Sequence, residues 1–343
     1  MTKHTRRSAR LLAIPLASLG LITAGAGVAS SAPAAVKCGT VITQNTTLTA
    51  NVGPCARGGL VIGADGITLD LGGFAVQGKA NRTGDGAGIL VSGRTGVTVE
   101  NGRVTDFDAG VALVGGSGNR VENLLVKDNV GTTKRGDFGD GIALADSDDN
   151  EIVGNDVIHN GPFDGIGLFG ASSGNLLEDN VVSGNDVSFT ADDGIRIEGP
   201  GATNNVVRGN TVTASTLDGI AIFSDQATGQ LNTGNLIEGN TVTGNGFGIL
   251  GARPGEGIRT FLRANDNTVR DNFVTDNAGS GILIANGSLN NTVADNVSTG
   301  NARQATAGTR FDLHDANVAP TPCDNNLWSG NVYGTANQAC VTG

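Results

Sequence analysis

An asparagine-based repeat constrains the fold of this chain more than any other feature of its sequence. Five copies of the unit place three asparagines at intervals of five residues, and they begin at Asn150, Asn175, Asn235, Asn267 and Asn291. Three further copies keep two of the three positions, at Asn119 and Asn129, at Asn205 and Asn210, and at Asn326 and Asn331. Eight copies in one register indicate a chain built from stacked, equivalent units.

Apolar residues also occupy fixed places in each unit. The first column lies two residues after the first asparagine and comprises Val121, Ile152, Leu177, Val207, Ile237, Val269 and Val293. The second lies seven residues after it and comprises Val126, Val157, Val182, Val212, Val242 and Val274, broken by Ser298. The third follows a glycine and comprises Ile142, Ile166, Ile195, Ile220, Ile249 and Ile282. Each unit is therefore predicted to hold three short strands with inward apolar residues, separated by asparagine turns.

The spacing of the units predicts a parallel β-solenoid. The third-column glycines are 24 to 33 residues apart, at Gly141, Gly165, Gly194, Gly219, Gly248 and Gly281. This is the length of a solenoid coil rather than of a propeller blade. Equivalent residues should stack at about 4.8 Å, which turns the apolar columns into core ladders and the asparagines into hydrogen-bonded ladders. Weaker copies at 66–71 and 96–99 extend the solenoid toward residue 41, so we expect nine or ten coils.

Composition agrees with a narrow tube and limits the function classes. The 343 residues include 55 glycines but only 11 Phe, one Trp and one Tyr. Stacked β-branched residues can fill such a tube without aromatics. The net charge of −11 becomes −15 without the first 34 residues, which carry four basic residues and no acidic one. We therefore expect no nucleic-acid partner.

The first 34 residues have the pattern of a secretory signal peptide. A basic region ends at Arg10, an apolar stretch runs over 11–29, and small residues follow at 30–34. A membrane anchor is the alternative interpretation, and Arg6 with Arg7 leaves both Sec and twin-arginine export open. We expect cleavage within 30–35, a secreted protein without membrane attachment, and one domain over 35–343.

Four cysteines lie near the two ends of the predicted mature chain. Cys38 and Cys55 are separated by 17 residues, and so are Cys323 and Cys340. In an oxidising compartment local pairing would place one bridge at each end, each stabilising by roughly 3 kcal/mol. A metal site would need tighter spacing or nearby histidines.

The repeat resembles a known superfamily. NTVADN at 291–296 and DGIRI at 193–197 are similar to units of the right-handed parallel β-helix proteins, which include pectate-lyase-like enzymes, polygalacturonases, alginate epimerases and NosD-type copper-maturation proteins. The resemblance covers roughly residues 41–340 and implies an all-β, single-stranded right-handed parallel β-helix. It is poor evidence for function, because this scaffold hosts enzymes, adhesins and binding modules.

An aspartate precedes the third-column glycine in four consecutive units, at Asp140, Asp164, Asp193 and Asp218, with Asp192 beside the third. Stacking would place these carboxylates about 5 Å apart in adjacent coils and about 10 Å apart two coils away, which brackets the separations in retaining and inverting glycosidases. Such a column could also bind Ca²⁺, the one candidate cofactor. Alternatively, the aspartates only cap turns, since Asp-Gly is common turn chemistry.

The surroundings of this column suggest a glycan site. Arg196 is expected to stand alone among small outward residues, between the acids, unless it is only a surface ion pair. We predict a catalytic set of Asp164, Asp192, Asp193, Arg196 and His159. We predict a substrate-binding set of Lys134, Arg135, Phe163, Phe189, Asp140 and Asp218. A hydrolase would use one aspartate as acid and another as base, whereas in a lyase or epimerase Arg196 or Ca²⁺ would neutralise a uronate while His159 or Lys134 removed a proton.

Specific family signatures match only in part. Asp164 and the pair Asp192–Asp193 are similar to polygalacturonase elements, but Asp218-Gly stands where that pattern has His-Gly. Residues 312–315 (DLHD) are similar to the Asp-Pro-His-Asp signature of alginate epimerases but lack the proline and lie near the last coil, so we interpret the match as chance. Copper chemistry is not expected, because the mature chain has no Met and two His.

The sequence therefore predicts a secreted, monomeric β-helix that binds or degrades an extracellular polysaccharide as a lyase, hydrolase or epimerase. The alternative is a non-catalytic structural or adhesive surface protein. The small number of aromatic residues available to stack on sugars favours the alternative somewhat.

Overall fold

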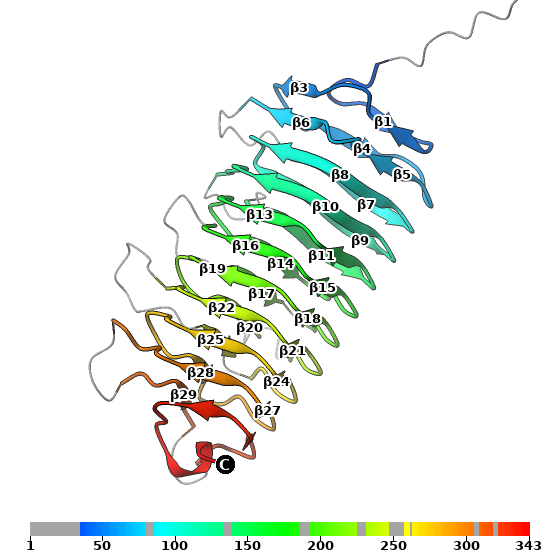
Figure 1. Ribbon diagram of the computed structural model, residues 1–343. Helices are drawn as coiled ribbons and strands as arrows, with labels where there is room; N and C mark the ends of the chain where they lie inside the picture. The colour runs from blue at the N-terminus through cyan, green and yellow to red at the C-terminus, as the bar shows by residue number, and fades with distance from the viewer. Residues whose placement is uncertain are drawn as a thin grey trace, which may run out of the picture. The chain divides into compact units, whose positions relative to one another are not determined.

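The computed structural model describes residues 35–79, 86–132, 139–185, 193–199, 201–224, 231–246, 257–260, 263–304, 309–317 and 322–343. The predicted signal peptide lies outside these ranges, as do Lys134, Arg135, Phe189 and Asp192. Within 35–343 the chain winds in successive parallel coils (Figure 1).

One side of the solenoid, called face A here, is a parallel sheet of eleven strands in the described residues. Each strand pairs with the next along the chain, in the order β1 (Val41–Ile42), β4 (Leu60–Ile62), β7 (Ala87–Thr95), β9 (Ala109–Ser117), β11 (Ile142–Asp148), β14 (Ile166–Phe169), β17 (Ile195–Glu198), β20 (Ile220–Phe223), β23 (Ile258–Thr260), β26 (Ile282–Ile284) and β29 (Leu313–Asp315). The predicted right-handed parallel β-helix is confirmed. The described residues form eleven coils rather than nine or ten, because the first coil, with the two-residue strand β1, carries no repeat signature.

Two further parallel ladders complete each coil, and the long strands β8 (Thr98–Thr105) and β10 (Arg120–Lys127) run through both. The remaining strands of face B are β2 (Thr46–Thr47), β5 (Thr68–Asp70), β12 (Glu151–Val153), β15 (Leu176–Glu178), β18 (Val206–Arg208), β21 (Leu236–Glu238), β24 (Thr268–Arg270), β27 (Thr292–Ala294) and β30 (Leu327–Ser329). Those of face C are β3 (Val52–Cys55), β6 (Ala75–Gly78), β13 (Asp156–Ile158), β16 (Val181–Ser183), β19 (Thr211–Thr213), β22 (Thr241–Thr243), β25 (Phe273–Thr275), β28 (Val297–Thr299) and β31 (Val332–Tyr333).

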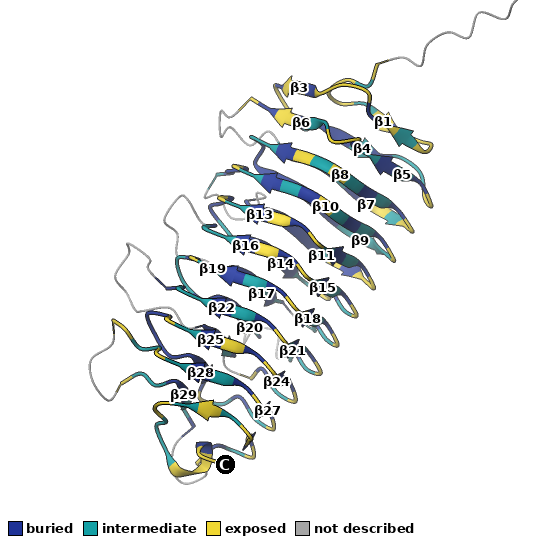
Figure 2. Ribbon diagram, in the orientation of Figure 1, coloured by how far each residue is buried: buried dark blue, intermediate teal, exposed yellow. Residues whose placement is uncertain are grey.

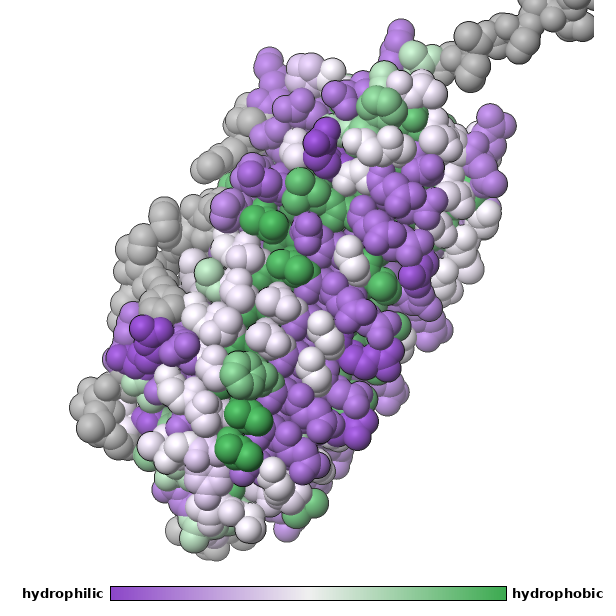
Figure 3. All heavy atoms as spheres, viewed as in Figure 1, coloured by the Kyte–Doolittle hydropathy of each residue, from purple (hydrophilic) through white to green (hydrophobic). Residues whose placement is uncertain are grey.

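The predicted apolar columns form the core. Ile152 on face B, Val182 on face C and Ile195 on face A are fully buried, and each is in register with the same column in an adjacent coil. Buried positions recur at the same place in successive strands (Figure 2). The outer surfaces of faces B and C are mostly hydrophilic or neutral, with apolar side chains in small groups (Figure 3). The inward register deduced from the repeat is therefore correct for these columns.

The asparagine columns form the predicted hydrogen-bonded ladders inside the bends. Asn150 donates from its backbone N and from Nδ2 to Oδ1 of Asn175, both at 2.9 Å. The second column repeats this geometry, since Asn180 donates from Nδ2 to Oδ1 of Asn210 at 2.9 Å. Because every link runs toward the C-terminus, the amide dipoles of a ladder are aligned along the solenoid axis.

The register of one coil differs from the sequence-based expectation. The third column was expected to continue through Gly248 and Ile249, but Ile258 is the residue that pairs with Ile220 of β20. The apolar residue of this coil therefore follows Gly257. A Gly-Ile dipeptide occurs at both places, so local sequence alone does not distinguish them.

Both ends of the solenoid carry the predicted disulfides. Cys38 bonds to Cys55 and Cys323 bonds to Cys340, which confirms the local pairing. The helix that the structure describes is the three-residue 3-10 segment η1 (Ala339–Val341). In the described ranges no helix is long and apolar enough to cross a membrane.

Neighbouring glycines of β9 provide a test of the close stacking. Gly116 has φ of +130° and lies against the backbone of Arg94, whereas Gly115 has φ of +60° and open space beside it. We expect Gly116→Ala to lower the free energy of unfolding by about 2–3 kcal/mol more than Gly115→Ala, which bears only a left-handed penalty of about 1–2 kcal/mol. Denaturant unfolding of both variants measures the difference, and equal losses would contradict the stacking of β7 on β9.

Candidate functional site

The four predicted aspartates form one column at the start of the face A strands. Asp140, Asp164, Asp193 and Asp218 are all buried. Oδ1 of Asp140 accepts a hydrogen bond from the backbone N of Asp164 at 3.0 Å, Oδ1 of Asp164 accepts from Asp193 at 2.9 Å, and Oδ1 of Asp193 accepts from Asp218 at 2.9 Å. The carboxylates of Asp140, Asp164 and Asp193 thus each cap the backbone of the next coil. This geometry is what the turn-capping interpretation requires.

Arg196 is held by groups on both sides. Its Nη1 lies 3.6 Å from Oδ2 of Asp193 and its Nε lies 2.8 Å from Oε2 of Glu198. The guanidinium also lies over the ring of Phe223, 5.2 Å from the centroid, in the arrangement of a cation–π contact. The side chain of Arg196 remains 17% exposed. The side chains of Asp193, Glu198 and Phe223 therefore hold the guanidinium in place, and the two carboxylates balance its positive charge.

Arg196 belongs to a row of outward residues on face A. The register continues from Gly167 through Arg196, Ala221, Arg259 and Leu283 to His314. The expectation that Arg196 stands alone is wrong, because Arg259 occupies the same row two coils away. A repeated motif contains the missed signal: EGIR at 256–259 matches DGIR at 193–196. The misassigned register at Gly248 concealed it.

The small outward residues of face A are covered by neighbouring side chains and do not form a solvent-exposed flat surface. Ala143 and Ala221 point away from the core and are nevertheless buried. Gly167 is covered by the ring of Phe169, with which any side chain at that position would collide. In the adjacent outward row, Glu198 pairs in register with Phe223. The partly exposed side chains of the outward rows thus include Phe169, Phe223, Arg196, Arg259, Glu198 and His314.

His159 lies apart from this arrangement. It occupies the turn after β13 with φ of +56°, and its Nδ1 lies 3.9 Å from Oδ1 of Asp128. In the described part of the chain no hydrogen bond or ion pair joins His159 to Asp164 or Arg196. Its proximity to Asp164 in sequence does not bring the two side chains into contact. Phe163 packs against Gly139, directly before the aspartate column.

The DLHD segment at 312–315 has a structural role in the last coil. Asp315 is fully buried and accepts hydrogen bonds at Oδ2 from Nδ2 of Asn326 and Nε1 of Trp328. Oδ1 of Asp312 accepts from Nδ2 of Asn301 at 3.0 Å. Both acids therefore end asparagine ladders, which supports the interpretation of the epimerase-like match as chance.

His314, between these two acids, is the last member of the outward row. Its Nδ1 lies 3.1 Å from Oγ of Ser280, and its ring meets Phe311 edge-on at 5.4 Å between centroids. Burial, and to a smaller extent the charge of Arg310, lowers the pKa of His314 to about 4. The imidazole is consequently neutral at neutral pH, and Nδ1 is already engaged.

Residues 72–259, more than half of the chain, match the family described as "Periplasmic copper-binding protein (NosD)". The chain belongs to the NosD family. No curated protein matches this NosD-family chain in sequence.

Solved structures share the fold of this NosD-family chain. The A-module of the mannuronan C-5 epimerase AlgE4 of Azotobacter vinelandii is 18% identical, with a TM-score of 0.57, and the match covers 86% of this chain and 79% of the module. The periplasmic alginate epimerase AlgG is 15% identical, with a TM-score of 0.57 and coverage of 88% and 72%. The Dettilon tailspike protein gp208 is 19% identical, with a TM-score of 0.56 and coverage of 80% and 60%. At these identities the matches establish the β-helix fold alone.

The residues of this chain do not fit the copper site that the family description implies. After residue 34 the sequence has no methionine and two histidines, and all four cysteines are in disulfides. His159 follows β13 in the coil of β11, while His314 lies on β29, six strand pairings further along face A, or about 29 Å at the usual spacing. Copper favours clustered imidazole and sulfur ligands. Among the described residues, no three His, Cys, Asp or Glu side chains could hold a metal ion together.

Proposed function

We propose that this NosD-family chain is a secreted, monomeric protein that binds an extended extracellular polysaccharide along the outward rows of face A. The observation that carries the proposal is the fixed position of the Arg196 guanidinium over the ring of Phe223, with Phe169 on the face A strand before that of Arg196. Proteins bind sugars with aromatic faces together with fixed hydrogen-bond donors. The β-helix neighbours named for mannuronan and alginate epimerases support a carbohydrate partner in general.

The location follows from the cysteines. The two disulfides indicate an extracytoplasmic protein, because such bridges persist in oxidising compartments. Removal of a signal peptide at residues 1–34 is part of the same proposal and accounts for the route of export.

A non-catalytic structural solenoid is the second candidate function. It is favoured by the aspartate column, in which Asp140, Asp164 and Asp193 are each occupied with capping a backbone amide. A buried, hydrogen-bonded carboxylate is poorly placed to act on a substrate, so catalysis by Asp164, Asp192, Asp193, Arg196 and His159 is a weaker proposal than binding.

Binding can be tested with a screen over extracellular polysaccharides, with and without Ca²⁺. We expect Phe223→Ala and Arg196→Ala to weaken the affinity at least tenfold, because they remove the ring and the donor of the outward row. Arg196→Ala also removes the ion-pair partner of the buried Asp193 and lowers stability, so its affinity is measured on protein shown to be folded by circular dichroism. The matched control is Arg208→Ala on face B, where Arg208 pairs with Glu178 at 2.6 Å. If no polysaccharide binds, or if Arg208→Ala weakens binding equally, the proposal is wrong.

Variants of Asp193 separate a catalytic from a capping role. Asp193→Asn keeps an acceptor for the backbone N of Asp218, whereas Asp193→Ala removes it at a cost of about 1 kcal/mol. We expect turnover of any bound polysaccharide, if present, to be unaffected by Asp193→Asn. Loss of turnover in this variant without a change in melting temperature would instead establish Asp193 as a catalytic residue.

A further inference from the structure

From β14 to β23, the outward residues of face A alternate between a phenylalanine and an arginine, so that each type recurs every second coil. Strand β14 presents Phe169 and β20 presents Phe223, while the intervening β17 presents Arg196, and β23 presents Arg259. Two coils span about 9.6 Å. The face therefore offers an aromatic ring and a guanidinium in alternation, each repeating at the length of a disaccharide unit in an extended 1→4-linked chain.

The charge of Arg196 is balanced before any ligand binds. Asp193 and Glu198 both contact Arg196, so its guanidinium contributes hydrogen-bond donors rather than net positive charge. The column of Asp140, Asp164 and Asp218 lies beside it, and the chain as a whole carries −11. A carboxylate-bearing polymer would meet like charge here, and like-charge juxtaposition opposes binding.

We propose that the ligand of face A is a neutral, extended polysaccharide and not a polyuronate. Sugar rings would stack on Phe169 and Phe223, and hydroxyl oxygens would accept hydrogen bonds from Arg196 and Arg259, one set per disaccharide. This inference rests on the proposed function and goes beyond it. It also sets this chain apart from the structural neighbours named for mannuronan and alginate.

The test compares hexasaccharides of the two classes on the full mature protein. The neutral probes are cello-, manno- and xylohexaose, and the anionic probes are oligogalacturonate and oligomannuronate. We expect at least one neutral probe to bind at least tenfold more tightly than either uronate. Its affinity should change by less than twofold between 0.1 and 1 M NaCl, where the Debye length falls from about 10 Å to about 3 Å.

The outcomes distinguish the two proposals. Tighter binding of a uronate, weakening steeply with salt, would overturn the neutral-ligand inference and leave the proposed function standing. Failure of every probe to bind, in a protein that is folded by circular dichroism, would contradict both.

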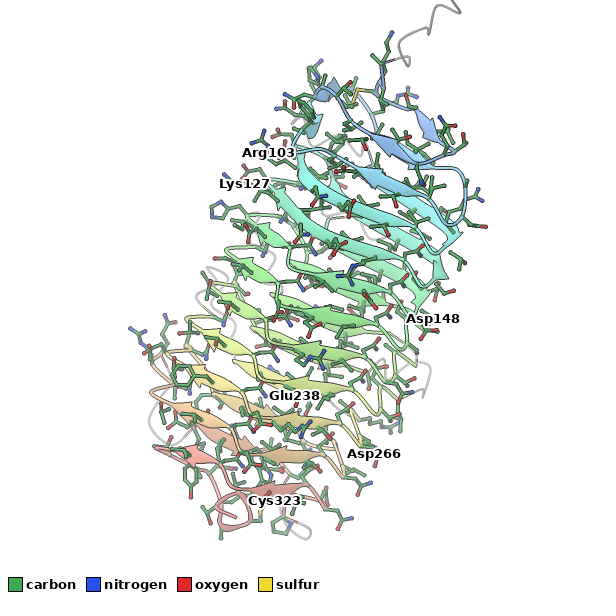
Figure 4. The ribbon with its side chains drawn as sticks, turned by 45° about the vertical axis from the view of Figure 1, so that its right-hand side comes forward. Arg103, Lys127, Asp148, Glu238, Asp266 and Cys323 are labelled. Carbon is green, nitrogen blue, oxygen red and sulfur yellow. A yellow bond between two sulfur atoms is a disulfide. The ribbon has the colours of Figure 1, made fainter. Side chains whose placement is uncertain are left out.

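A charge variant gives an independent readout. Glu198→Gln removes one of the two acids that balance Arg196, so we expect uronate affinity to rise several-fold. Glu238→Gln is the matched control, because Glu238 of β21 (Figure 4) forms a similar pair with Arg270 at 2.7 Å but on face B. An equal rise in both variants, or none in Glu198→Gln, would mean that charge balance at Arg196 does not determine the ligand class.

Discussion

Replacement of Val182 by Asp is expected to unfold the solenoid or to lower its free energy of unfolding by more than about 4 kcal/mol. Val182 is fully buried in the second apolar column, between Val157 and Val212 of the adjacent coils. A carboxylate there has no polar partner among these stacked valines. Circular dichroism and denaturant unfolding of the purified variant measure the loss.

Val181 provides the matched control, because it precedes Val182 on the same strand and is 40% exposed. Val181→Asp places the same charge on the outer surface, beside Asp156 in register, and should cost no more than about 1 kcal/mol. Equal losses in the two variants would show that the inward register of face C is wrong. A stable Val182→Asp protein would contradict the solenoid core itself.

The repeat predicted the core columns because their spacing from the asparagines is fixed. Faces B and C are joined by short asparagine turns of constant length, so position +2 and position +7 remain inward in every coil. The connection into face A varies in length, and there the repeat does not determine the register. That is why Ile249 was assigned to the third column when Ile258 occupies it.

The sequence predicted that the aspartates stack in one column, but it did not predict the contacts that each side chain makes. Asp164 and Asp193 stack as their position before glycine indicates. Each carboxylate also accepts a hydrogen bond from a backbone N–H of the next coil, and this contact depends on the orientation of the side chain in three dimensions. His159 is a different case, since sequence proximity to Asp164 suggested a shared site, and no hydrogen bond or ion pair joins the two side chains within the ranges that the structure describes. It occupies a left-handed turn position instead, where the fold selects for backbone geometry.

Replacement of Asp315 by Ala is expected to lower the free energy of unfolding by about 3–5 kcal/mol, because buried donors left without an acceptor cost about 1–3 kcal/mol each. Every asparagine ladder donates toward the C-terminus, so its last amide needs an acceptor. Asp315 supplies one to Asn326, and it also accepts from Nε1 of Trp328 and from the backbone N and Nδ2 of Asn317. After its removal the Nδ2 groups of Asn317 and Asn326 keep the carbonyl of Ser288 as an acceptor. The backbone N of Asn317 and Nε1 of Trp328 lose the acceptor that the described structure gives them.

Asp156→Ala is the control, because Asp156 is exposed on β13 and its replacement should change stability by no more than about 0.5 kcal/mol. The loss in free energy of unfolding for Asp315→Asn should lie between those of the two alanine variants. The amide keeps one acceptor oxygen, but its N–H groups point at two of the donors. If Asp315→Ala were as stable as Asp156→Ala and instead lost polysaccharide turnover, the DLHD segment would be a catalytic signature after all. The last amide of the asparagine ladder would then need no acid as its acceptor. The similarity to the alginate epimerases would extend from the fold to the chemistry.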